Sequence, residues 1–254
     1  MPSPRSNDKP LSRPIKISVE GNIGSGKSTF LNYFKQFSFV ETYTEPLDKW
    51  RDVQGHNLLE LLYEDMAKWS TTFQSYVQLT RTQVQTTSPK SGVKIQIFER
   101  SVQNNRYCFM ENAYNNGFIL PAQYSVLCKW YEWIQENVDI SLDLIVYLKT
   151  NPEVVHKRVI SRNRAEEKIS LDYMESLHKA HERWLMDPNQ KIPVVVVDAN
   201  KCFDDVIQSC QKQLPALFTD EIPGAVTMPF KFLCATCRNL IRSWEPNPDK
   251  RCLT

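Results

Sequence analysis

The chain has 254 residues, of which 41% are hydrophobic and 24% charged, so it can bury a substantial core and is not a disordered polymer. Its 31 basic and 29 acidic side chains leave a formal net charge of +2, which gives no bulk attraction to nucleic acid or to an anionic membrane surface. We therefore expect neither nucleic acid nor membrane as a partner, and any anion-binding site must be local.

The two ends of the chain differ in composition from its middle. Residues 1–14 carry four prolines and Asp8 and lack the apolar run of a secretory signal, so they are predicted to be a flexible extension. Residues 219–254 are rich in proline and are predicted to be an irregular tail. Residues 15–218 remain as one domain, and no apolar run approaches the roughly 18 residues of a membrane helix.

Cysteine and histidine spacing gives no metal signature. The seven cysteines are an odd, scattered set, typical of reduced thiols, so we expect a cytoplasmic protein, with nuclear and mitochondrial locations left open. Cys234 and Cys237 form a lone C-x-x-C pair, which favours a chance pair or a weak redox site over zinc. His178 and His181 fit neither common zinc motif, and we predict them as a pair on a helix surface.

Predicted strands and helices alternate along the chain. Strands are predicted over residues 15–20, 39–43, 93–98, 142–148 and 193–197. Helices are predicted over residues 28–37, 58–68, 69–85, 101–115, 122–137, 153–162, 171–185 and 203–217. This alternation predicts an open parallel α/β sheet.

The first strand is followed by a phosphate-binding loop. Residues 21–28 fit the pattern G-x-x-x-x-G-K-[ST] between a predicted strand and a predicted helix. The glycines allow backbone N–H groups to turn inward and hold an anion with the positive end of the helix. The residues expected to hold the triphosphate donor are Gly21, Asn22, Ile23, Gly24, Ser25, Gly26, Lys27, Ser28 and Thr29. Lys27 would neutralise the β- and γ-phosphates, and Ser28 would bind magnesium.

Charged residues follow the next two predicted strands. Glu45 comes after the second strand and would point into the crevice where ligands bind in such sheets, although a solvated turn is the alternative. Glu99 and Arg100 come after the third strand: the acid could hold magnesium and the base could brace the transferring phosphoryl group, or the two could form a salt bridge at a helix start.

Arg158, Arg162 and Arg164 form a third charged group, at the end of a predicted helix. On a mobile loop such arginines could close over a triphosphate, whereas the alternative is a surface charge run. The phosphate loop by itself leaves a GTPase switch, a motor ATPase, a nucleotide kinase and a nucleoside kinase open.

The combined motifs resemble the deoxyribonucleoside kinase family, which includes deoxycytidine and deoxyguanosine kinases, the mitochondrial-type thymidine kinase and the broad insect enzyme. The matching segments, in family order, are residues 20–28, 44–50, 73–76, 99–101, 143–148 and 162–167. The likeness is closest to the thymidine-kinase-like and insect branch. It implies a P-loop kinase-type three-layer fold with a central parallel five-stranded sheet flanked by helices, an arginine-rich lid, ATP with Mg²⁺, a deoxyribonucleoside substrate, and a homodimer packed through the region of residues 101–137.

The resemblance also implies a role for individual residues. Glu45 would be the base for the 5′-hydroxyl, Arg100 its neighbour, and Arg162 and Arg164 the lid arginines. The nucleoside would be held by Trp50, Tyr63, Phe73, Gln74, Val77, Phe109 and Glu167, with Phe109 stacked on the base, Gln74 reading its edge, and Tyr63 and Glu167 on the 3′-hydroxyl. Phe203 would lie near the donor adenine.

Arg81 departs from the thymidine-preferring pattern, which has an apolar residue there. Deoxycytidine and deoxyguanosine enzymes have an arginine at this position, paired with an aspartate. The aspartate position is Asn105 here, so Arg81 is expected to lack its usual acidic partner. Its charge and size should disfavour the 5-methyl group of thymine and broaden or shift base selectivity. The alternatives are a nucleoside monophosphate kinase of similar fold and a P-loop regulatory nucleotide-binding protein.

Overall fold

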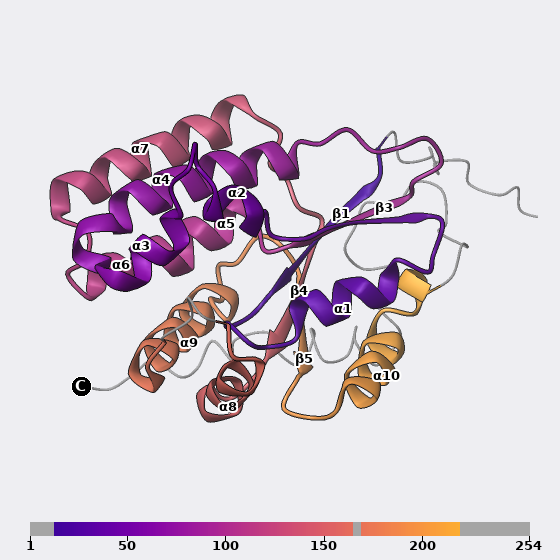
Figure 1. The fold of residues 1–254 in the computed structure, drawn as a ribbon. Helices are drawn as coiled ribbons and strands as arrows, with labels where there is room; N and C mark the ends of the chain where they lie inside the picture. The colour runs from indigo at the N-terminus through magenta and orange to yellow at the C-terminus, as the bar shows by residue number, and fades with distance from the viewer. Residues whose placement is uncertain (1–12, 165–168, 219–254) are drawn as a thin grey trace, which may run out of the picture.

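A computed structural model describes residues 13–164 and 169–218 (Figure 1). Its centre is a parallel five-stranded sheet, as predicted, and the strand order is β2-β3-β1-β4-β5. The strands are β1 (Ile15–Glu20), β2 (Val40–Tyr43), β3 (Ile95–Glu99), β4 (Leu144–Lys149) and β5 (Val194–Asp198). Because β1 is central and pairs with both β3 and β4, the loop that leaves its carboxyl end emerges in the middle of the sheet.

Twelve helical elements connect and cover the strands in the described part of the chain. They are α1 (Lys27–Phe34), α2 (Leu47–Arg51), α3 (Leu58–Glu64), α4 (Met66–Gln85), α5 (Val102–Asn104), the π-helix η1 (Asn105–Met110), α6 (Glu111–Asn115), α7 (Pro121–Asn137), α8 (Pro152–Arg162), α9 (Leu171–Leu185), α10 (Phe203–Gln213) and the 3₁₀-helix η2 (Pro215–Phe218).

The helices form a layer on each face of the sheet (Figure 1). On one face α1, α10 and η2 pack on alternate strand residues such as Ile17 and Val146, which are fully buried. On the other face α4 and α9 cover Phe98, Ile145 and Tyr147. Helix α7 packs on the outer side of α4 and η1. Burial on both faces explains why β4 is a continuous apolar run rather than an alternating one.

Several helix boundaries differ from the prediction for local reasons. The break between the second and third predicted helices lies at Asp65, whose carboxylate accepts a hydrogen bond from the Lys68 N–H at 3.0 Å and caps α4. The short helix α2 was not predicted, since five residues after Pro46 show no periodicity. The predicted helix over 101–115 contains the π-helical turn η1, which apolar spacing does not reveal.

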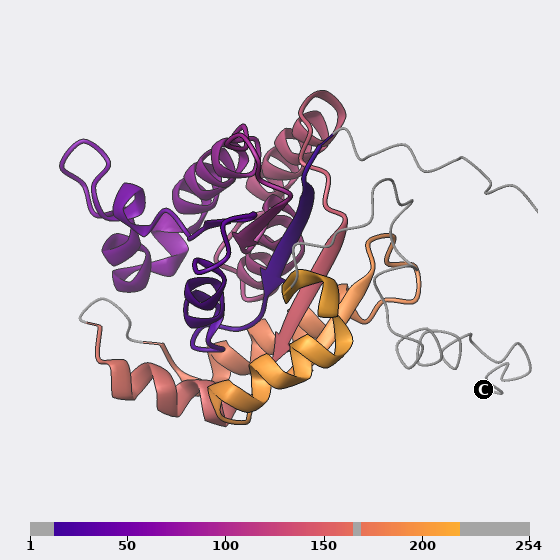
Figure 2. The same cartoon turned by 90° about the vertical axis from the view of Figure 1, so that its right-hand side faces the viewer.

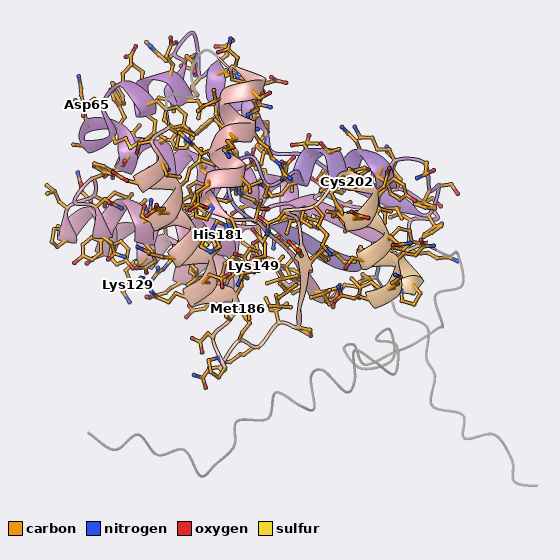
Figure 3. The ribbon with its side chains drawn as sticks, turned by 90° about the horizontal axis from the view of Figure 1, so that it is seen from below. Asp65, Lys129, Lys149, His181, Met186 and Cys202 are labelled. Atoms are coloured by element: carbon orange, nitrogen blue, oxygen red, sulfur yellow. The ribbon has the colours of Figure 1, made fainter. Side chains whose placement is uncertain are left out.

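The pair of histidines on α9 corrects another expectation. His178 is partly buried, but His181 is completely buried, so the prediction of a surface pair is wrong. Figure 3 shows His181 near the centre of the molecule, with Lys129 and Asp65 at its periphery. The helix turns His181 toward the sheet, where its ring stacks on Tyr147 with centroids 6.2 Å apart. Within the described ranges no cluster of three His, Cys, Asp or Glu side chains could hold a metal ion.

The expected end segments fall largely outside the described residues, and Cys234 and Cys237 lie there as well. Arg13 is an exception, since its guanidinium makes two hydrogen bonds of 2.7 and 2.8 Å to the Asp143 carboxylate at the start of β4. Among the helices that are described, none combines the length and hydrophobicity needed to span a membrane.

Candidate active site

A cavity of about 570 Å³ opens beside the carboxyl ends of β1, β2 and β3. The phosphate-binding loop and α8 line one end of it, and α2, α3, α4 and η1 line the other. Figure 2 shows α3 and α8 flanking α1 on one side of the molecule. A cavity of this size, with a polar end and an apolar end, suits a small ligand.

The phosphate-binding loop has the backbone that its glycines predict. Gly21 has φ +145°, and a Cβ there would lie 2.7 Å from both the Leu148 carbonyl oxygen and Ser25 Oγ. Gly26, at φ +92°, is the N-cap of α1. The loop therefore begins α1 in the conformation that directs backbone N–H groups at an anion.

Lys27 is buried within this loop. Its Nζ donates to the carbonyl oxygens of Asn22 at 2.7 Å and Gly21 at 3.1 Å. Burial, and then the nearby positive charge of Arg100, lower the pKa of Lys27 to about 7. An anion bound in the loop would favour the charged form of this amine.

The acceptor end of the cavity is built around Glu45. Its Oε1 accepts from Arg81 Nη2 at 2.6 Å, and its Oε2 accepts from Arg100 Nη1 at 2.6 Å. All three side chains are at most 10% exposed. The carboxylate follows β2, one guanidinium follows β3 and the other comes from α4, so three separate segments meet at one charge cluster.

The two guanidinium groups keep Glu45 ionised. Burial raises the pKa of this carboxyl, but the charges of Arg100, Arg81 and Lys27 outweigh that effect and lower the pKa to about 2. A carboxylate in this state is only a hydrogen-bond acceptor, so a ligand hydroxyl beside it must donate its proton toward it.

Arg100 is held in a conformation that non-glycine residues rarely adopt, with φ +61°. Its N–H donates to the Val19 carbonyl at 3.1 Å, and the next residue, Ser101, donates from Oγ to Glu20 Oε1 at 2.7 Å. Such strain persists where the surroundings fix it. Here it directs the Arg100 side chain back toward Glu45.

Ser28 and Glu99 meet at the mouth of the phosphate loop. Ser28 Oγ donates to Glu99 Oε1 at 2.7 Å. A hydroxyl and a carboxylate beside a phosphate site are the hard oxygen donors that Mg²⁺ prefers. The donor set therefore fits the metal expected from the sequence.

Aromatic and amide side chains line the far end of the cavity. The Phe109 ring lies under the two guanidinium groups, with its centroid 5.5 Å from Arg81 Cζ and 5.0 Å from Arg100 Cζ. Trp50 donates from Nε1 to Thr80 Oγ1 at 2.9 Å, which fixes its ring. Gln74 is buried, and its Oε1 has no hydrogen-bond partner within the described residues.

Most predicted site residues line this one cavity. They are Ile23, Gly24, Ser25, Gly26, Lys27, Ser28, Thr29, Glu45, Trp50, Tyr63, Phe73, Gln74, Val77, Arg81, Glu99, Arg100, Phe109, Arg158, Arg162, Arg164 and Phe203. Gln74, Val77 and Arg81 share one face of α4, as their spacing predicted. Glu167 lies outside the described residues.

Three predicted residues do not line the cavity. Gly21 shapes the loop backbone from behind, and Asn22 donates from Nδ2 to the Met174 carbonyl at 2.8 Å, which ties the loop to α9. Asn105, the first residue of η1, is fully buried behind α4 and donates to the Gln74 carbonyl at 3.3 Å. Its contact with substrate stays a prediction.

Arg81 lacks the usual acidic partner at position 105, as expected, but it has another one. That partner is Glu45 rather than a residue at position 105. The Arg81 side chain does not turn to solvent, because it is only 5% exposed. The pairing depends on α4 passing beside the end of β2, which no local pattern encodes.

Sequence reasoning missed several lining residues. Leu59 and Leu62 on α3, Tyr173 at the start of α9, and Lys201 and Cys202 before α10 also face the cavity. The two leucines share the apolar stripe of α3, which could have indicated them. Tyr173 and Lys201 carry no signal, because they reach the cavity only through the packing of α9 and the course of the loop before α10.

A phosphate-binding loop that opens on an enclosed cavity, opposite a carboxylate held by two arginines, defines a P-loop phosphotransferase acting on a small acceptor. Residues 17–216 match the family model described as deoxynucleoside kinase. The chain belongs to the deoxynucleoside kinase family.

Known relatives agree with this assignment. The chain is 40% identical over 222 residues to the mitochondrial thymidine kinase 2 of Homo sapiens, covering 86% of this chain and 83% of that protein. It is 35% identical over 226 residues to the deoxycytidine kinase of Homo sapiens, covering 76% of this chain and 87% of that protein. A probable deoxycytidine kinase of fowlpox virus is 37% identical over 194 residues, covering 75% of this chain and 81% of that protein.

The charge cluster makes stability depend on pH in a defined direction. The folded pKa of Glu45, about 2, lies below its usual value of 4.5, so its contribution is complete above pH 4.5 and is lost as pH falls toward 2. We expect the difference in unfolding free energy between wild type and Glu45→Gln to shrink by on the order of 1 kcal/mol between pH 6 and pH 3.5.

Urea unfolding at several pH values measures this difference. Glu64→Gln, on the exposed side of α3, controls for titration elsewhere in the protein. A difference between wild type and Glu45→Gln that stays constant with pH would contradict the described pairing.

Proposed function

We propose that this cavity transfers the γ-phosphoryl group of ATP to the 5′-hydroxyl of a deoxyribonucleoside, giving the monophosphate and ADP, in nucleotide salvage. ATP-dependent deoxyribonucleoside phosphorylation is the activity of the family to which the chain belongs. The observation that carries the assignment of the site is Glu45, which is held between Arg81 and Arg100 in the same cavity as the phosphate loop.

Glu45 orients the sugar hydroxyl and takes its proton. Both carboxylate oxygens already accept from an arginine, and each keeps a lone pair for a further donor. A carboxyl with a pKa of about 2 is a weak base. That is sufficient here, because in a loose transition state the proton leaves late and the main requirement is orientation.

Positive side chains stabilise the charge that moves during transfer. Lys27 and Arg100 lie at the boundary between the loop and the acceptor site. Arg162 and Arg164 line the cavity at the end of α8 and are assigned to the lid over the triphosphate. The loop from Gly21 to Thr29 holds the phosphates, and Phe203 borders the donor base.

Mg²⁺ is assigned to Ser28 and Glu99, whose oxygens are 2.7 Å apart. When bound there, the ion would offset the negative charge of the phosphates. The protein's part is to keep these two oxygens side by side at the first turn of α1.

The nucleoside is assigned to the far end of the cavity. Phe109 provides a face for the base, and the unpartnered Oε1 of Gln74 provides a hydrogen-bonding edge. Trp50, Phe73 and Val77 complete the pocket, and Tyr63 is assigned with Glu167 to the 3′-hydroxyl.

The domain limits and the compartment are also proposals. Residues 15–218 are taken as the catalytic domain, with 1–14 as an extension and 219–254 as a tail. A cytoplasmic location is supported by four free cysteines within the described residues, namely Cys108, Cys128, Cys202 and Cys210.

Glu45→Gln tests the role of the carboxylate. The amide keeps the size of the side chain but removes its charge, so we expect nucleoside binding to remain and turnover to fall by at least about 100-fold. Transfer from labelled ATP to thymidine measures turnover, and thymidylate offered in parallel tests the alternative of a monophosphate kinase. Near-normal turnover in the variant, or preference for thymidylate, would refute the assignment.

Arg81 is proposed to shift base selectivity. Its guanidinium lies over Phe109 and within 5.6 Å of the Trp50 ring centroid, so it occupies room beside the base and adds donors there. In Arg81→Met we expect the ratio of kcat/KM for thymidine over deoxycytidine to rise by at least about 10-fold. Measuring kcat/KM for four deoxynucleosides gives this ratio. The same relative kcat/KM values in wild type and Arg81→Met would contradict the proposal.

A homodimer is proposed through the outer face of α7. Val126, Trp130 and Trp133 form one stripe on this helix and are 58%, 58% and 52% exposed, and Leu79 on the neighbouring α4 is 52% exposed. Two large tryptophans on one exposed face favour a protein partner that buries them. The resemblance to the family implies that this partner is a second copy of the chain.

Light scattering after gel filtration tests the dimer. We expect wild type at about twice the mass of one chain and Trp130→Glu at the monomer mass, since a charge would be buried in the interface. Ile160→Glu, an exposed apolar position on α8, serves as the matched control and should stay dimeric. A monomeric wild type would overturn the proposal.

A further inference from the structure

Arg81 has a second anchor on the side away from Glu45. Its Nη1 donates to Asn104 Oδ1 at 3.2 Å and to the Ser101 carbonyl at 3.4 Å. Its Nε has no partner within the described residues. The orientation of the guanidinium plane therefore depends on Glu45 at one corner and on the start of the helix after β3 at the other.

The orientation of Asn104 is fixed in turn by His181. Asn104 is fully buried, and its Nδ2 lies 3.2 Å from His181 Nε2. His181 Nδ1 lies 2.8 Å from the Leu177 carbonyl oxygen. Because a carbonyl only accepts, Nδ1 carries the proton and Nε2 is the acceptor. Asn104 must then present its NH₂ group to His181 and its oxygen to Arg81.

The reverse amide orientation is excluded by both neighbours. It would direct the NH₂ group at the Arg81 guanidinium, which has only donors, and the amide oxygen at an imidazole lone pair. Burial, opposed by the Leu177 hydrogen bond, lowers the pKa of His181 to about 3, and Arg100 and Lys27 act in the same direction as burial. The histidine therefore stays neutral, and the chain of hydrogen bonds has one direction.

We propose that Asn104 and His181 are positioning residues that set base selectivity by fixing the guanidinium of Arg81. This inference rests on the selectivity proposed for Arg81. Neither residue lines the cavity, so each acts through Arg81. Without the Asn104 oxygen, Arg81 is held mainly by Glu45, can rotate about that contact, and leaves room beside Phe109 for a 5-methyl group.

A double-mutant cycle on selectivity tests this relation. The ratio of kcat/KM for thymidine over deoxycytidine is measured for wild type, Arg81→Met, Asn104→Ala and the double variant. We expect Asn104→Ala to raise the ratio about 5- to 10-fold, the size of effect that the loss of one ordinary hydrogen bond produces. In the Arg81→Met background the same change should alter the ratio less than 2-fold.

Two further variants separate positioning from general damage. His181→Phe keeps an aromatic ring against Tyr147 but removes the acceptor, so it should shift the ratio in the same direction as Asn104→Ala. Gln103→Ala is the matched control, because it removes a buried amide one residue before Asn104. The Gln103 amide donates to the Ile140 carbonyl at 2.8 Å and makes no bond to Arg81. Its ratio should equal that of wild type.

The outcomes distinguish a failure of this inference from a failure of the assigned reaction or of the selectivity proposed for Arg81. No phosphorylation of any nucleoside by wild type would contradict the assigned reaction, and an unchanged ratio in Arg81→Met would contradict the role of Arg81. A shifted ratio in Arg81→Met with none in Asn104→Ala and His181→Phe would overturn the inference alone. So would an Asn104→Ala effect that persists undiminished in the Arg81→Met background.

Discussion

The site depends on one buried charge cluster, in which the carboxylate of Glu45 lies between the guanidinium groups of Arg81 and Arg100. An unpaired charge in this position would be costly, so the three groups stabilise one another. Their pairing also keeps the acid ionised and able only to accept hydrogen bonds. In the proposed reaction, a sugar hydroxyl that enters the cavity directs its proton toward Glu45 and a lone pair of its oxygen toward the phosphate loop.

The remainder of the fold keeps this cluster in place from several directions. The parallel sheet brings the ends of β1, β2 and β3 together, which sets the phosphate loop beside Glu45 and Arg100. Helix α9 is tied to both halves of the site: Met174 accepts from Asn22 in the loop, and His181 reaches Arg81 through Asn104. A single helix thus contacts both the donor end and the acceptor end of the site.

Residues in contiguous motifs or at strand ends were predictable from the sequence. The phosphate loop is a local motif, and Glu45 and Arg100 follow strands whose carboxyl ends share an edge in a parallel sheet. The partner of Arg81 was not predictable, because it depends on how α4 crosses the end of β2. The burial of Asn105 was not predictable either, because apolar spacing does not reveal the π-helical turn in which it lies, and the burial of His181 depends on which side of α9 meets the sheet.

The central claim is that Glu45 aligns the acceptor hydroxyl with the phosphate loop. A crystal structure with a deoxynucleoside and a non-hydrolysable ATP analogue tests it most directly. The account predicts the 5′-oxygen within about 2.6–3.2 Å of a Glu45 oxygen and in line with the γ-phosphorus. A nucleoside bound with its 5′-oxygen turned away from Glu45, and hydrogen-bonded to a different side chain, would contradict it.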